Sequence, residues 1–304
     1  MSGICDGRVA VITGAGGGIG RAHALAFAAE GAKVVVNDLG GSRDGTGNDA
    51  GPAQKVVDEI TAAGGEAVAN TDDISTFAGA KKLIDQAVDT FGGLHTLVNN
   101  AGILRDKMMV NMDESQWDAV IAVHLKGTFG PAHHAAAYWR DQSKAGNQPD
   151  ARIINTTSPS GLFGNVGQAN YGAAKAGIAA FTLITATELG RYGVTCNAIA
   201  PVALTRMTED LGGFSEMELK EGEWNPFAPE NISPLVVWLG SNESAAVTGR
   251  VFMVTGGQIT VVEGWVGGPK VDAARQWEPG ELSEVVPDLV AKAASNATMG
   301  GTRG

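Results

Sequence analysis

Tyr171 and Lys175 stand four residues apart in an Ala-rich stretch and could together move a proton. On a helix this spacing places both side chains on one face. A phenol with an ordinary pKa of about 10 exchanges protons poorly at neutral pH, and a neighbouring cation would stabilise the phenolate and lower that pKa. The pair is therefore a candidate general acid–base for an alcohol or ketone oxygen. Taken alone, a Tyr and a Lys at this spacing are usually a helix surface pair.

A glycine-rich turn, Thr13–Gly20 (TGAGGGIG), separates the first strand-like run from a helical pattern. Glycines let the backbone approach a pyrophosphate, whose charge is stabilised by the free N–H groups at a helix N-terminus. Asp38 ends the second strand-like run about 20 residues later, where a carboxylate binds both hydroxyls of an adenosine ribose and repels a 2′-phosphate. This pattern favours NAD over NADP. The alternative is that Asp38 only begins the following turn.

Short β-branched runs alternate along the chain with longer Ala-rich helical patterns, as in βαβ units around a buried parallel sheet. Strands are expected at Arg8–Thr13, Lys33–Asn37, Glu66–Asn70, Leu94–Val98, Ala151–Thr157, Val194–Ile199 and Arg250–Thr255. Helices are expected at Ile19–Glu30, Pro52–Ala63, Thr76–Phe91, Glu114–Asp141, Gln168–Tyr192 and Glu230–Ser241. The order predicts an α/β fold: a single doubly wound Rossmann-type domain with a seven-stranded parallel sheet and helices on both faces.

Two segments do not follow that alternation. Residues 204–225 come after the sixth strand, where an open α/β sheet has its ligand crevice, and mix large apolar residues with two glycines. We expect a substrate lid there, within an NAD-binding and catalytic domain of residues 1–266. Residues 267–304 form a C-terminal extension with one weak helical stretch, Glu281–Ala294. The extension is either a frayed end or an arm that binds a partner.

Composition argues against several classes of function. The 304 residues carry 22 Lys and Arg against 33 Asp and Glu, a net charge of −11, and lack the basic run that nucleic acid would need. The two cysteines, Cys5 and Cys196, cannot build a disulfide framework, and the five histidines lack metal-site spacing, so no metal is expected. No apolar stretch is long enough to span a membrane, and the first residues do not read as a signal peptide. These features predict a cytoplasmic protein that acts on a small molecule.

Four motifs occur in a characteristic order: Thr13–Gly20, Asn99–Gly102 (NNAG), Ser158, and Tyr171–Lys175 (YGAAK). With these motifs the chain resembles the short-chain dehydrogenase/reductase family over residues 8–257. Within the family, the runs at 37–41, 123–127, 164–171 and 200–208 resemble the (3R)-hydroxyacyl-CoA dehydrogenase part of peroxisomal multifunctional enzyme type 2 and its bacterial relatives. These resemblances imply an NAD-dependent oxidoreductase that interconverts a secondary alcohol and a ketone.

The resemblance implies a role for each catalytic residue. Tyr171 would exchange a proton with the substrate oxygen, Lys175 would hold the nicotinamide ribose, and Ser158 would align the substrate oxygen through a hydrogen bond. The alternative for Ser158 is a turn-forming serine before Pro159. His124 stands where the wider family has an Asn that supports a water chain to the lysine. It would either relay a proton or be a buried helix histidine that only packs.

The same resemblance implies the cofactor contacts. Asp73 and Ile74 correspond to the pair beside the adenine, and the run Asn100–Gly102 to the segment beside the adenosine ribose. At the nicotinamide end, Val202 replaces the glycine that usually follows Pro201 in the family. The expected cofactor-binding residues are Gly14, Gly17, Gly18, Ile19, Gly20, Asp38, Leu39, Asp73, Ile74, Asn100, Ala101, Gly102, Tyr171, Lys175, Pro201 and Thr205.

Several functions stay open at this point. The leading hypothesis is an NAD-dependent dehydrogenase of a 3-hydroxyacyl-CoA, and a hydroxysteroid dehydrogenase would use the same machinery. A 3-oxoacyl carrier-protein reductase would usually use NADPH, and the carboxylate of Asp38 argues against that cofactor. A non-catalytic dinucleotide sensor would have no reason to keep the three catalytic residues together.

Two further expectations concern partners. A coenzyme A thioester would need a basic rim on this acidic chain, for which Arg105, Lys107 and Arg206 are candidates, although exposed basic residues are most often only solvated. The family also implies a homo-dimer or homo-tetramer, formed through the helices expected at Glu114–Asp141 and Gln168–Tyr192.

Overall fold

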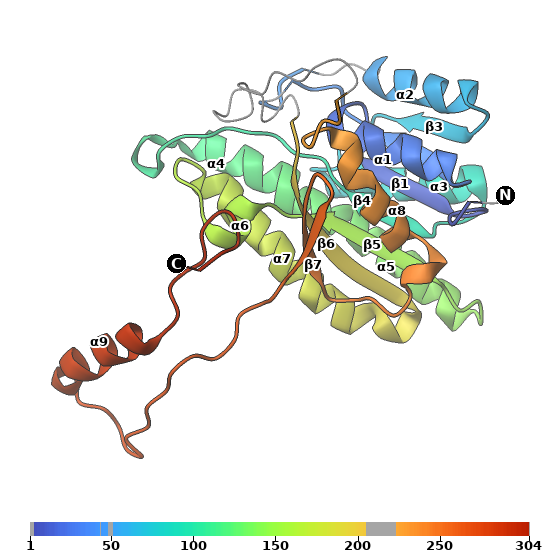
Figure 1. Cartoon of the computed structure of the whole chain (residues 1–304). Coiled ribbons are helices and arrows are strands. Elements are labelled where there is room, and N and C mark those ends of the chain that lie inside the picture. Colours follow the sequence, from blue (N-terminus) through green and yellow to red (C-terminus); the bar gives the residue numbers. More distant parts are fainter. Residues whose placement is uncertain (1–2, 43, 48–50, 205–222, 304) are drawn as a thin grey trace.

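A twisted sheet lies at the centre of the fold (Figure 1). The structure is a computed structural model that describes residues 3–42, 44–47, 51–204 and 223–303. Within these residues the sheet has eight strands in the order β3-β2-β1-β4-β5-β6-β7-β8. They are β1 (Val9–Thr13), β2 (Lys33–Asn37), β3 (Glu66–Asn70), β4 (Thr96–Asn99), β5 (Ala151–Thr156), β6 (Val194–Val202), β7 (Val251–Thr255) and β8 (Gln258–Val262). The first seven are parallel, as the sequence predicts.

The eighth strand corrects the prediction of a seven-stranded sheet. β8 pairs antiparallel with β7 across the two-residue turn Gly256-Gly257, in which Gly256 has a φ of 55°. As the edge strand it has a neighbour on one side only, and Ile259 and Val261 stay about half exposed, at 55% and 50%. A strand this open to solvent lacks the continuous buried apolar run by which central strands such as β1 and β5 can be recognised.

Burial on both faces explains why the central strands read as continuous apolar runs. Every residue of β1 and β5 is buried. Such strands need helices on both sides of the sheet, because each face would otherwise expose β-branched side chains to water.

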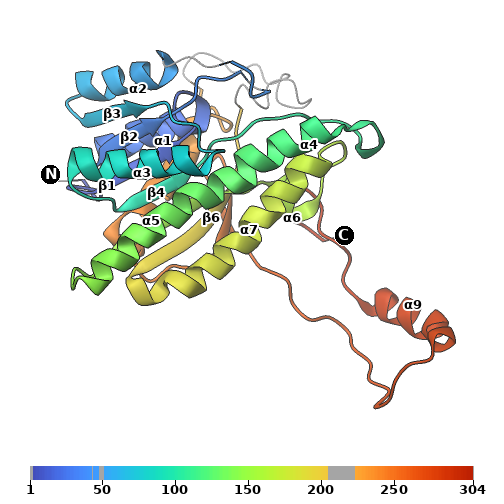
Figure 2. The same ribbon diagram turned by 180° about the vertical axis from the view of Figure 1, so that it is seen from behind.

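Helices cover both faces of the sheet (Figures 1 and 2). One face packs with α1, α2 and α8 around Phe27 and Val236, and the other with α3, α5 and α7 around Leu83 and Trp139. The helices are α1 (Gly18–Ala29), α2 (Gly51–Ala62), α3 (Phe77–Phe91), α4 (Glu114–Ile121), α5 (Gly127–Lys144), α6 (Pro159–Phe163), α7 (Ala169–Leu189), α8 (Ser233–Gly240) and α9 (Leu282–Lys292). In the described part of the chain, none of them is long and apolar enough to cross a membrane.

The helix predicted at Glu114–Asp141 is interrupted. α4 ends at Ile121, a π-helical turn covers Ala122–Lys126, and α5 begins at Gly127. A π-helical turn inserts a residue into the helical repeat, re-aims the side chains within it and is frequent at functional sites. This one carries His124, which is 1% exposed. The apolar pattern does not reveal the interruption, because the residues on both sides keep helical spacing.

Beyond β8 the chain leaves the sheet as an arm, residues 263–303 (Figures 1 and 2). α9, at the place of the helix expected at Glu281–Ala294, lies away from the rest of the fold. The end of the arm returns to α6 in both views, where a β-carbon on Gly301 would lie 3.5 Å from Phe163 Cζ. Partner binding by the extension and the division at residue 266 stay predictions.

The predicted lid, residues 204–225, lies mostly outside the described residues. Leu204, two residues after the end of β6, donates its backbone N–H to the Phe227 carbonyl at 2.7 Å. Thr205 and Arg206 both lie outside the described residues.

Candidate active site

A cleft lies at the carboxyl ends of the central strands, where an open α/β sheet places its ligands. Residues that directly follow five strands line it, among them Gly14 after β1, Asp38 after β2 and Asn100 after β4. Of the predicted cofactor residues, all except Thr205 line this cleft: Gly14, Gly17, Gly18, Ile19, Gly20, Asp38, Leu39, Asp73, Ile74, Asn100, Ala101, Gly102, Tyr171, Lys175 and Pro201. His124 lines it as well.

The glycine turn is shaped for an anion. α1 begins at Gly18 without a side-chain cap, so no side chain occupies its first N–H groups. Gly14, with a φ of 63°, adopts a left-handed conformation that few other residues tolerate. A β-carbon on Gly20 would lie 2.1 Å from the Gly14 carbonyl oxygen, so only glycine allows this close packing. Gly17 lines the cleft, and a β-carbon there would meet nothing within 4 Å.

Asn100 holds that turn in place. Its side-chain Nδ2 donates to the carbonyls of Thr13 and Gly14, at 3.0 and 3.1 Å. Its backbone N–H donates to Thr13 Oγ1 at 3.0 Å. The Asn-Asn-Ala-Gly motif therefore braces the glycine motif across the β1–β4 pair.

Asp38 begins a turn, which is one of the two arrangements that the sequence left open, and it also contacts the glycine turn. One carboxylate oxygen accepts the Gly16 N–H at 2.8 Å, and the other accepts the Gly40 N–H at 2.7 Å, as in a turn-initiating aspartate. Each oxygen keeps a second lone pair for another donor. A carboxylate that lines the cleft beside the glycine turn can therefore also bind ribose hydroxyls.

Tyr171 and Lys175 come together at the start of α7. Lys175 Nζ lies 5.6 Å from the centre of the Tyr171 ring and donates to the Thr156 carbonyl at 2.6 Å. Lys175 is 3% exposed, and burial lowers its pKa to about 7, because a buried ammonium loses its hydration. The helical spacing predicted from the sequence is confirmed.

The predicted lowering of the Tyr171 pKa is wrong for this structure. Burial raises the pKa of Tyr171 to about 12, a hydrogen bond with the Ser158 hydroxyl opposes the increase, and the Asp106 carboxylate adds to it. The reason is that the enclosed position disfavours the phenolate, and burial also disfavours the charge of the neighbouring Lys175. Tyr171 is thus a proton donor at neutral pH.

Ser158 has the turn-forming role that the sequence left open and also lies beside Tyr171. Its hydroxyl oxygen caps α6 by accepting the Ser160 N–H at 3.2 Å, and Pro159 occupies the first helical position. The same side chain hydrogen-bonds Tyr171. Ser158 is 8% exposed and does not itself line the cleft, whereas its neighbour Thr157 does.

His124 packs against the catalytic tyrosine. The two rings are T-shaped, with centroids 5.1 Å apart. Nε2 faces the backbone of Ile103, 3.0 Å from its nitrogen and 2.8 Å from its oxygen, while Nδ1 is buried with no partner among the described residues. Burial, and then the Lys175 charge, lower the His124 pKa to about 3. The imidazole is therefore neutral near pH 7, so any proton relay through it would use neutral tautomers.

The cleft also has residues that the sequence analysis did not propose. Thr156 and Thr157 immediately precede Ser158 at the end of β5, and that position in a parallel sheet was a usable signal. Ser42 and Gly45 come from the glycine-rich loop after β2, whose composition gives no periodic pattern. Only the fold places that loop beside the cleft.

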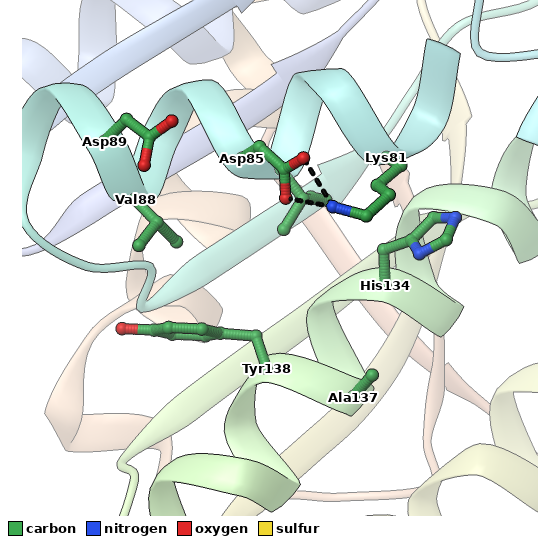
Figure 3. A pocket seen from close by; sticks show the side chains of 8 residues that line it. Lys81, Asp85, Val88, Asp89, His134, Ala137 and Tyr138 are labelled. Atoms are coloured by element: carbon green, nitrogen blue, oxygen red, sulfur yellow. Dashed lines mark hydrogen bonds and ion pairs between the residues drawn. The ribbon is translucent and has the colours of Figure 1, made fainter. Parts of the chain in front are cut away.

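A second hollow lies between α3 and α5 and contains none of the predicted site residues (Figure 3). Lys81 and Asp85 form an ion pair on its α3 side, and His134 and Tyr138 line it from α5. Among the described residues, no group of three or more His, Cys, Asp or Glu side chains could hold a metal ion.

Known proteins are similar to this chain over most of its length. Residues 8–214 match the short chain dehydrogenase family. Hydroxyacyl-CoA dehydrogenase ChsB1 of Mycobacterium tuberculosis is 47% identical over 293 residues, which cover 94% of this chain and 89% of that protein. Peroxisomal multifunctional enzyme type 2 of Mus musculus is 45% identical over 254 residues, 84% of this chain but only 32% of the mouse protein.

A solved structure supports the same assignment. The crystal structure of a short chain dehydrogenase from Mycobacterium avium is 58% identical in sequence and has a TM-score of 0.87, with 97% of this chain and 98% of that chain covered. A likeness of this extent covers nearly the whole chain. This chain therefore belongs to the short-chain dehydrogenase family and is an oxidoreductase of the kind that acts on CH–OH groups with a nicotinamide cofactor.

Proposed function

We propose that this enzyme uses NAD to interconvert the secondary alcohol and ketone of a 3-hydroxyacyl-CoA. The observation that carries the proposal is a cleft that joins Asp38 and the glycine turn to Tyr171 and Lys175. An adenosine-binding carboxylate, a pyrophosphate turn and an acid–base pair thus line a single space.

The residues fit a dinucleotide. The uncapped start of α1 and the open space at Gly17 suit a pyrophosphate, and Asp38 suits a ribose with free hydroxyls. A negative charge at Asp38 would oppose the 2′-phosphate of NADP, which supports NAD as the cofactor.

The proton chemistry follows from the positions of three side chains. When bound, the nicotinamide supplies or accepts the hydride. Tyr171, protonated at neutral pH, donates its proton to the substrate oxygen in the reduction and must take a proton back in the oxidation. Ser158 orients the phenol and the substrate oxygen. Lys175, in its protonated form, carries positive charge 5.6 Å from the centre of the Tyr171 ring.

The substrate class is supported by the names of the relatives, two of which are a hydroxyacyl-CoA dehydrogenase and a peroxisomal multifunctional enzyme. Of the basic residues suggested for a coenzyme rim, Arg105 is engaged elsewhere, because its Nε donates to the Asp44 carbonyl at 2.9 Å. Lys107 is exposed in the same loop and is the better candidate for a phosphate contact.

The test is a rate panel on the purified protein. We expect NAD to support oxidation of a 3-hydroxyacyl-CoA faster than oxidation of the same acid without coenzyme A, and NADP to support it poorly. Faster turnover of a hydroxysteroid would show that the substrate is a steroid rather than a thioester, with the same proton chemistry at Tyr171. A preference for NADPH and carrier-protein thioesters would favour the reductase alternative.

We also propose that the protein is a homo-dimer or homo-tetramer. Three large apolar side chains on the outer faces of the long helices support this: Phe129 on α5, and Leu183 and Ile184 on α7, are 43%, 45% and 57% exposed. Analytical ultracentrifugation tests it, and a monomer at micromolar concentration would contradict it. A cytoplasmic location stays a prediction.

A further inference from the structure

Hydrogen bonds join two loops that are distant in sequence, and we name this contact the latch: Arg105–Lys107, after β4, with Gly167–Asn170, before and at the start of α7. The Lys107 N–H donates to the Gly167 carbonyl at 2.9 Å. Gln168 Nε2 donates to Asp106 Oδ2 at 2.8 Å. Asn170 Nδ2 donates to the Arg105 carbonyl at 3.0 Å. A short parallel bridge between Lys107 and Gln168 completes the contact.

Each loop of the latch leads directly to a side chain of the candidate site. On one side, the Tyr171 N–H donates to Asn170 Oδ1 at 2.7 Å, and Asn170 is fully buried. On the other side, Ile103 precedes Arg105 by two residues and holds His124 Nε2 through its backbone. A shift of either loop would therefore move the two rings relative to each other.

Asp106 is the charged member of the latch. Its Oδ2 accepts from Gln168, whereas its Oδ1 is buried with no hydrogen-bond partner among the described residues. A buried carboxylate oxygen without a partner is destabilising by roughly 1–3 kcal/mol or more. The buried Oδ1 of Asp106 does not stabilise the fold, so its position points to a role in the reaction.

The surroundings of Tyr171 indicate that role. The described groups around this residue are the Ser158 hydroxyl, the Lys175 ammonium at 5.6 Å, the neutral His124 ring at 5.1 Å and the Asp106 carboxylate. Among these groups, Asp106 brings the single negative charge.

We propose that Asp106 is a positioning residue of the reaction: through Gln168 it holds the Tyr171 end of α7 against the loop that contacts His124. The same carboxylate is negatively charged and therefore disfavours a negative charge on the nearby Tyr171 oxygen. It thereby adds to the effect of burial, which keeps the phenol protonated, and raises the pH above which the residue can accept a proton. This inference rests on the proposed role of Tyr171.

The first test removes the charge and keeps the hydrogen-bond acceptor. In Asp106→Asn, the new side-chain oxygen can still accept from Gln168. We expect the pH at which kcat/KM for alcohol oxidation reaches half its maximum to fall by at least about half a unit, because a like charge near the phenolate is gone. Asp118→Asn, which removes an exposed carboxylate on α4, is the matched control and should leave that pH unchanged.

The second test breaks the latch and keeps the charge. Gln168→Met has a similar length and cannot donate, so it releases Asp106 and also the Asn165 amide that now donates to Gln168 Oε1. We expect kcat to fall about tenfold, with the KM for NAD changed less than twofold. The Asp106→Asn variant should instead keep kcat at its own pH optimum within about threefold.

Tyr171→Phe, measured in the same assay, separates the two proposals. If that variant keeps wild-type turnover, the proposed function fails. If it is inactive while Asp106→Asn leaves the pH dependence unchanged, only the inference about Asp106 is overturned. Thermal melting verifies folding, and Asp106→Ser serves for the pH measurement if Asp106→Asn does not fold.

Discussion

The β-carbon that an alanine would place at Gly102 lies 2.4 Å from His124 Cε1. Contacts of this kind below about 3 Å do not occur, so the histidine ring occupies the space that a side chain at residue 102 would need. The ring then reaches the backbone of Ile103 at hydrogen-bond distance. The last glycine of the Asn-Asn-Ala-Gly motif and the unusual histidine are therefore fitted to one another.

We expect Gly102→Ala to displace the His124 ring and, with it, the Tyr171 ring that packs on it. The free energy of unfolding should fall by roughly 1–3 kcal/mol, as for other overpacked sites, and turnover should fall at least about tenfold. Denaturant unfolding and initial rates measure both. Gly190→Ala, where a β-carbon meets nothing within 4 Å, is the control; equal effects of the two substitutions would contradict the fit.

Tyr171→Phe keeps the packing against His124 and removes the transferable proton. Turnover should fall by about a thousandfold, the size of a general acid–base contribution, while the Kd for NAD and the melting temperature stay near those of the wild type. Tyr138→Phe, in the hollow of Figure 3, should behave as the wild type. More than about a tenth of wild-type turnover in Tyr171→Phe would refute the assignment.

Lys175 should make stability depend on pH. Its pKa is about 7 in the fold, against about 10.4 in an unfolded chain, so the unfolded state binds more protons between these values. Below pH 7 the lysine is charged in the fold, and its burial destabilises the protein to the full extent. Between pH 7 and about 10.4 the free energy of unfolding therefore rises with pH, by at most about 1.4 kcal/mol per pH unit.

In Lys175→Met this rise should be absent, which unfolding curves at pH 6 to 10 would reveal by comparison with the wild type. The variant should also bind NAD more weakly and turn over more slowly, because the positive charge near Tyr171 is lost. A parallel rise of stability in both proteins would show that another group titrates.

Asp38→Ser should weaken the preference for NAD over NADP by at least about tenfold, equivalent to ~1.4 kcal/mol, because the charge that opposes a 2′-phosphate is removed. The kcat/KM ratio for the two cofactors is the measurement. Asp58→Ser, on the exposed side of α2, is the control. If the wild type already uses both cofactors equally, Asp38 does not select the cofactor.

Lys107→Glu should raise the KM for a 3-hydroxyacyl-CoA several-fold and leave the KM for a neutral hydroxysteroid unchanged, since only the thioester carries phosphates. Lys144→Glu, an exposed position at the end of α5, controls for net charge. Equal changes in KM for both substrates would show that Lys107 does not contact the phosphates of the thioester.

The sequence by itself determined the features that depend on neighbours along the chain. Gly14, Gly18 and Gly20 turn the backbone from β1 into α1, and Tyr171 and Lys175 share a helix face through their spacing. Short runs that alternate with helical patterns predict the seven parallel strands. Each of these follows from backbone geometry or from periodicity within one element.

The tertiary structure alone decided the features that depend on residues brought together from distant elements. The sign of the Tyr171 pKa shift depends on burial and on Asp106, which lies 65 positions earlier in the sequence. The strand β8 follows a tight turn and has no buried apolar run by which it could be recognised. The π-helical turn aims His124 at Ile103, and Arg105 is bound to a loop that no periodicity places beside it. Burial and charge act through space, and pairs such as Asp106 and Gln168 meet only because parallel strands bring their following loops to one edge of the sheet.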